Sequence, residues 1–137
     1  SIEFNQNTNK KFIFNFIVPN LQSVKEFTFS SSSIKYLYAP SLKSVDKNAF
    51  TECLGLYQIV APELEKIGDY AFKQNVSLHK FPFNNIKQCG EAAFAACASL
   101  PNFMIKYFRS LTSDPIDATR RQDEIQQYQK GNYYLKY

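Results

Sequence analysis

Residues from which catalytic and metal sites are commonly built are scarce in this chain. Its 137 residues include one His, three Cys, one Met, no Trp and only four Gly. The cysteines form no C-x-x-C pair and the glycines form no phosphate-binding loop, so neither a metal site nor a nucleotide site is predicted. A histidine-based nucleophilic site must involve His79, which stands in no recognisable pattern with Ser, Asp or Cys. The sequence therefore predicts a protein that is not an enzyme and has no cofactor.

Long apolar runs and long runs of one charge are missing as well. Apolar stretches such as residues 16–18 are far too short to cross a membrane, and residues 1–5 lack the basic and apolar regions of a signal peptide. Because the chain does not begin with Met, removal of a targeting signal stays open. The net charge is +4, but the Lys and Arg residues are scattered. We therefore predict no membrane insertion within this chain and no nucleic-acid partner.

Aromatic residues are abundant instead. The chain has 13 Phe and 9 Tyr, and 45% of its residues are apolar while 20% are charged. This composition is sufficient for one ordered domain with a continuous core. Because there is one Met and no Trp, Phe is expected wherever the core recurs.

A 22-residue repeat runs through the middle of the chain. A shift of 22 residues, applied twice, superimposes three units without a slip in register. Their shared pattern is P-x-L-x-x-(V/I/C)-(G)-x-x-A-F-x-x-(C/N)-x-x-L-x-x-(I/F). In the first of these units the aligned residues are Pro40, Leu42, Val45, Ala49, Phe50, Cys53, Leu56 and Ile59. One unit alone cannot bury its apolar side, so the units are predicted to stack around a shared core.

The units on either side of this array are less regular. Residues 19–39 form a unit of 21 residues, in which the serine run at 30–33 is expected to replace the Ala-Phe and Cys positions. The predicted divisions are a truncated repeat or cap over 1–18, repeats over 19–39, 40–61, 62–83 and 84–105, and a C-terminal cap or helical tail over 106–137. Asp114 and Pro115 match a helix N-cap and first position, which predicts a polar helix from there to about Lys130.

Each unit is predicted to alternate two short elements. Residues 56–61 are expected to form a strand whose Leu56, Ile59 and Ala61 side chains point inward, and one or two helical turns are expected around residues 71–72. The apolar spacing within a unit also fits one face of a long helix. The recurring prolines and the fixed repeat length argue against that helix.

The Ala-Phe pair, the Cys three residues later and the proline after the strand resemble the leucine-rich repeat family, in particular the variant of BspA-like and treponemal surface proteins. The resemblance covers about two thirds of the chain and weakens in the first units and in the tail. It implies an α/β solenoid, a right-handed stack with a parallel sheet on one face and short helical turns on the other. It also implies a protein-binding or adhesion module with a protein partner. A cell-surface or secreted location is favoured by the resemblance, with a cytoplasmic one as the alternative.

Three cysteines and one asparagine are predicted to point into the core. Cys53 and Cys97 share a column two repeats apart, so their Cα atoms are expected roughly 10 Å apart, which is too far for a disulfide. Cys89 occupies another inward column. Asn75 replaces Cys in the first column and begins the only N-x-Ser/Thr sequon. Because an inward amide can satisfy backbone groups, this sequon is predicted to be structural and not glycosylated.

The outward side of the strands is the predicted binding face. Alternation along each strand sends the neighbours of the inward residues to solvent, and the repeat aligns them in rows. One row has no charge in any unit, and an exposed apolar row is not needed for folding. The candidate binding residues are Ile17, Lys35, Tyr36, Tyr38, Tyr57, Val60, His79, Lys80 and Met104. Three alternatives stay open: stacking that only stabilises the sheet, a tail that covers this face, and a structural spacer without its own ligand.

Overall fold

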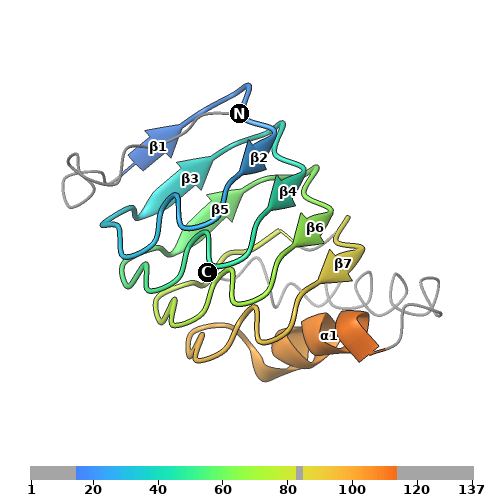
Figure 1. Cartoon of the computed structure of the whole chain (residues 1–137). Helices are drawn as coiled ribbons and strands as arrows, with labels where there is room; N and C mark the ends of the chain where they lie inside the picture. The colour runs from blue at the N-terminus through green and yellow to red at the C-terminus, as the bar shows by residue number, and fades with distance from the viewer. Residues whose placement is uncertain (1–14, 83–84, 114–137) are drawn as a thin grey trace.

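The chain winds as a solenoid whose successive coils lie side by side (Figure 1). The computed structural model describes residues 15–82 and 85–113. The coils build two parallel sheets. The first sheet contains β1 (Asn15–Ile17), β3 (Tyr36–Tyr38) and β5 (Gln58–Val60), and the second contains β2 (Ser23–Val24), β4 (Ser44–Val45), β6 (Lys66–Ile67) and β7 (Gln88–Cys89). Helix α1 (Asn102–Ser113) follows the last coil, and no helix in the described ranges is long and apolar enough to cross a bilayer.

Strand pairing follows the repeat length residue by residue. In the first sheet Tyr36 pairs with Asn15 on one side and with Gln58 on the other, which are steps of 21 and 22 residues. Gln58 continues to Lys80 through an isolated parallel bridge. The second sheet shows the same steps between its strands. The parallel solenoid and the alignment of its columns are therefore confirmed.

The core is a stack of equivalent layers, one from each coil. The strand residues Leu56, Ile59 and Ala61 are at most 2% exposed, as predicted from their inward positions. Phe occupies one column in successive coils, where neighbouring rings stack with their centroids 5.1–5.4 Å apart. This column consists of Phe29, Phe50, Phe72 and Phe94. Aromatic stacking therefore joins each layer to the next.

The segment that returns from the second sheet to the first is a series of turns, so the predicted helical turns are not observed in the described coils. In the coil of residues 40–61, Asn48 and Glu52 have φ of 57° and 61°. Such left-handed residues interrupt a right-handed helix, which needs negative φ at every position. The equivalent pairs in the other coils are Phe27 and Ser31, Tyr70 and Gln74, and Ala92 and Ala96. The apolar residues whose spacing fits a helix therefore lie in turns, and these turns form hydrogen bonds with the neighbouring coil.

The coil of residues 19–39 is one residue shorter than the others, and the missing position comes directly after Ser32. Thr28 and Phe29 fill the Ala-Phe positions, since both are buried and the Phe29 ring stacks on Phe50. Ser32 faces Cys53, with its Oγ 3.6 Å from the Sγ. The prediction that the serine run replaces the Ala-Phe pair is therefore wrong. The sequence did not reveal these positions because Thr28 stands where the other units have Ala.

Helix α1 closes the end of the stack at the place where the repeat predicts one more strand (Figure 1). Met104, Phe108 and Leu111 are 1%, 1% and 7% exposed and lie on one helical face. Phe108 stacks on Phe94 at 4.5 Å between centroids, so the helix extends the Phe column. The prediction of Met104 on the outward strand face is wrong, because the helical period turns it into the core with Phe108. The helix predicted from Pro115 lies outside the described residues.

Candidate functional site

The outward side of the first sheet carries exposed apolar side chains. Ile17 is 64% exposed, Tyr57 43% and Tyr38 37%. Ile17 pairs with Tyr38, and Tyr38 pairs with the half-buried Val60, in the predicted row. The alternating residue Leu37 is fully buried beneath them. The sheet therefore presents large apolar groups to solvent although its core side is already filled.

The other residues predicted for this face are polar or partly covered. Lys35 is exposed, while Tyr36, His79 and Lys80 are half-buried. The Nδ1 atom of His79 lies 2.6 Å from the carbonyl oxygen of Ser77, which orients the imidazole ring against its own turn. With the exception of Met104, the predicted residues lie on or next to the paired segments of the first sheet.

Charge on this strand face is of one sign. Within its described segments, the charged side chains are those of Lys35 and Lys80. The carboxylates of the described coils lie on the turns or along the second sheet: Glu26, Asp46, Glu52, Glu63, Glu65, Asp69 and Glu91. Charges of one sign repel one another, so these lysines disfavour contact with a surface that has excess Lys or Arg.

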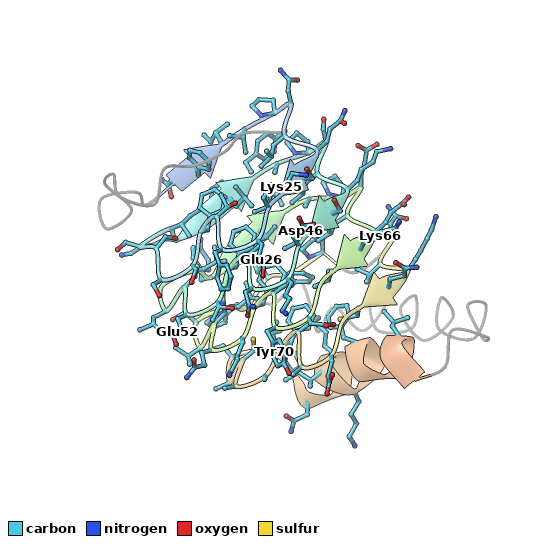
Figure 2. All side chains as sticks on the ribbon, viewed as in Figure 1. Lys25, Glu26, Asp46, Glu52, Lys66 and Tyr70 are labelled. Atoms are coloured by element: carbon cyan, nitrogen blue, oxygen red, sulfur yellow. The ribbon has the colours of Figure 1, made fainter. Side chains whose placement is uncertain are left out.

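A shallow hollow over the second sheet was not predicted from the sequence. It has a volume of about 460 Å³ and lies over β4 and β6, where Asp46 and Lys66 flank it (Figure 2). Gly68, which has no side chain to fill this space, forms part of its wall. Its lining mixes carboxylates and ammonium groups. Within residues 15–82 and 85–113, no three His, Cys, Asp or Glu side chains are placed to hold a metal ion.

Inside the core, the column of Cys53, Asn75 and Cys97 is a ladder of side-chain donors. Each side chain donates to the carbonyl oxygen of the Phe in the preceding coil. The acceptors are Phe29, Phe50 and Phe72, at 2.9, 2.7 and 3.0 Å. Asn75 is fully buried, which agrees with its predicted inward position and keeps its amide nitrogen from solvent. Its Oδ1 accepts no hydrogen bond from the described residues, which costs about 1–3 kcal/mol relative to a satisfied group.

The thiols of Cys89 and Cys97 are held in their protonated form. Burial raises the pKa of Cys97 to about 12, against an opposing hydrogen bond from the Asn75 backbone. Burial, followed by the nearby negative charge of Asp69, raises the pKa of Cys89 to about 12. The thiolate is the nucleophilic and metal-binding form of cysteine. At neutral pH these two side chains therefore act as small apolar core residues.

We expect the free energy of unfolding to fall above pH 9, with a slope approaching about 1.4 kcal/mol per pH unit for each of these two thiols. The unfolded chain releases both protons near pH 9, whereas the folded chain keeps them to about pH 12. Their stabilising contribution is therefore complete below pH 9 and is lost as the pH rises through 12. Urea unfolding across this range measures the slope. The Cys89→Ala, Cys97→Ala variant is the control, and an equal slope in both chains would contradict this assignment.

Comparison with known families agrees with the repeated coils. The family model described as BspA type leucine rich repeat region matches residues 2–114 in six copies. Neither the curated proteins nor the solved structures give a significant match. The matched region spans most of the 137 residues and includes every described coil. The chain therefore belongs to the BspA-type leucine-rich repeat family.

Proposed function

We propose that this chain binds a protein partner through the outward side of its first sheet, with Ile17, Tyr38 and Tyr57 as the principal contacts. The observation that carries this proposal is the exposure of these three large side chains on a face whose folding does not require them. Tyrosine is enriched among residues that dominate binding energy at protein interfaces. Membership of a leucine-rich repeat family also supports a role in protein interaction.

Two other roles are weaker explanations of this face. Cross-strand stacking stabilises a sheet through side chains that cover one another, yet Tyr38 and Tyr57 keep more than a third of their surface exposed. A structural spacer without a ligand needs no apolar row on its solvent side. We propose a binding module because the described part of this face offers apolar contact area and lysine charge.

Replacing both Tyr38 and Tyr57 by alanine is expected to weaken partner binding by at least about 30-fold, since an interface hot spot contributes about 2 kcal/mol or more. The partner is first captured from cell extract on the immobilised wild-type chain and identified by mass spectrometry. Its affinity for each variant is then measured by calorimetry with the purified partner. Folding is expected to persist because both rings lie on the solvent side of the sheet, and urea unfolding checks this.

Phe27→Ala is the matched control for this measurement. Phe27 is 43% exposed, as is Tyr57, but it lies on the turn after β2. This variant is expected to bind the partner with wild-type affinity. Equal affinity for the tyrosine variant and the wild type would place the site elsewhere. Failure of the wild-type chain to retain any specific partner would favour the spacer role.

A further inference from the structure

Backbone hydrogen bonds join the turn segments of neighbouring coils, three of them at each of the two junctions between residues 40 and 98. In each case alternate N–H groups of one coil donate to alternate carbonyl oxygens of the next. Between the coils of residues 40–61 and 62–83 the pairs are Asn48 to Asp69, Phe50 to Ala71 and Glu52 to Lys73, at 3.0, 2.8 and 2.8 Å. One coil further on they are Tyr70 to Glu91, Phe72 to Ala93 and Gln74 to Ala95, at 3.0, 2.8 and 2.7 Å. The ladder thus runs in one direction along the solenoid.

The last coil repeats the donor side of this ladder, but the described part of the chain supplies it with no acceptors. Its equivalent donors are the N–H groups of Ala92, Phe94 and Ala96, and these make no hydrogen bond to any residue in the described part of the chain. Ala92 and Ala96 keep φ of 51° and 59°, the conformation that aims the corresponding donors in the earlier coils. The coil therefore ends in three aligned donors like those that bind a neighbouring coil elsewhere.

A pocket of about 520 Å³ lies between this turn segment and α1. Its walls include Cys97 and Ile105, and Phe108 and Phe94 close it where their rings stack. Phe108 therefore occupies the place of the Phe that a next coil would supply. Helix α1 covers the Phe column but provides no carbonyl oxygen to the three donors.

We propose that residues 91–98 form a docking edge for a polypeptide segment of a protein partner. The segment offers three carbonyl oxygens at alternate residues to Ala92, Phe94 and Ala96, and it has a small residue where a coil of this solenoid has Phe. This site is separate from the strand face and does not depend on the function proposed for it.

The ladder itself argues for a polypeptide backbone as the occupant. Donors on alternate residues are spaced for the carbonyl groups of another chain, as in peptides that add to an exposed backbone edge. A small anion would contact one donor and leave the others unpaired. The largely apolar pocket beside the donors fits a small side chain, which supplies selectivity. The requirement for a small residue follows from Phe108, since its ring already covers Phe94.

The test uses the complete ¹⁵N-labelled chain and two capped synthetic peptides that copy residues 68–75, which are the acceptor segment of an internal coil. One peptide carries the change Phe72→Ala and the other keeps Phe. The alanine peptide is expected to shift the amide signals of Ala92, Phe94 and Ala96 saturably and to slow their hydrogen exchange by about 10-fold or more. The Phe peptide is expected to bind at least about 10-fold more weakly because its ring meets Phe108.

Internal amides provide the control within the same spectra. Tyr70, Phe72 and Gln74 already donate to the next coil, so their signals should not respond. The Tyr38→Ala, Tyr57→Ala variant should bind the alanine peptide like the wild type, which separates this site from the strand face. Absence of saturable shifts, equal binding of both peptides, or the same shifts with inorganic phosphate would each overturn the proposal. So would slow exchange at Ala92 and Ala96 before peptide is added, since the chain would then satisfy these donors itself.

Discussion

Replacing Phe72 by alanine is expected to lower the free energy of unfolding by about 3–5 kcal/mol. The ring is fully buried, stacks on Phe50 and Phe94 at 5.1 and 5.4 Å between centroids, and meets Phe81 edge-on at 5.0 Å. Its removal takes aromatic contacts from two neighbouring coils at once. The backbone ladder fixes the spacing between these coils, so the cavity cannot close by local collapse. Urea unfolding followed by circular dichroism measures the change as a lower midpoint at constant m.

The matched control is again Phe27→Ala, which removes the same ring from a position that is 43% exposed. This change is expected to lower the free energy of unfolding by less than about 1 kcal/mol. Phe72→Leu is expected to fall between the two, because leucine fills part of the space without continuing the stack. A similar loss for Phe72→Ala and Phe27→Ala would mean that the Phe column does not join the coils.

The columns of the core could be predicted because every coil faces the same packing problem. Leu56, Ile59 and Ala61 recur at a fixed offset. Ile59 and Ala61 share the inward side by strand alternation, whereas Leu56 is buried from the turn before β5. The outward row follows from the same register, which is why Tyr38 and Tyr57 could be placed before the structure was known. The repeat predicts the direction of these side chains but not what covers the face, so only the structure shows how far they are exposed.

The turns could not be predicted because their conformation comes from the neighbouring coil. Glu52, Tyr70 and Ala96 adopt positive φ, although none of them is a residue type that favours it. Hydrogen bonds between coils, and not local propensity, hold these dihedrals. Apolar residues spaced by four therefore fit a helix in the sequence, whereas the backbone forms turns that contain two residues with left-handed dihedrals. The N–H donors at the edge of the last coil could not be predicted either, because they too depend on hydrogen bonding between coils.

The end of the array shows a second limit of periodicity. Met104 stands at the offset of an outward strand residue, yet it is buried in α1 beside Phe108. A repeat pattern describes positions that have a neighbouring coil on both sides. The last layer needs an apolar cover, and the amphipathic helix α1 supplies it. Its apolar residues recur with the helical period of about 3.6 residues and not with the strand period of two. The change from coil to helix therefore could not be read from the alignment of units alone.

Glycine in the second-sheet column allows two coils to approach closely. Gly68 follows β6, and its N–H donates to the carbonyl oxygen of Val45 at 2.8 Å. A Cβ atom at Gly68 would lie 2.5 Å from the Lys47 nitrogen and 2.8 Å from the Asp46 carbonyl carbon. Both are backbone atoms of the preceding coil, so no side-chain rotation can relieve the overlap. The close approach, and not an unusual φ, requires glycine here.

Gly68→Ala is therefore expected to lower the free energy of unfolding by about 3 kcal/mol, at the upper end of the usual overpacking range. Gly55→Ala is the matched control, because its Cβ would meet the Lys35 Cγ at 3.7 Å and the Lys35 Cε at 3.9 Å, both ordinary contacts with a flexible side chain. That variant is expected to gain about 0.4–1 kcal/mol, since alanine restricts the unfolded chain more than glycine does. Urea unfolding of both variants should thus give changes of opposite sign. If Gly68→Ala were as stable as Gly55→Ala, the coils would have to stand further apart at β6 than the hydrogen bond to Val45 allows.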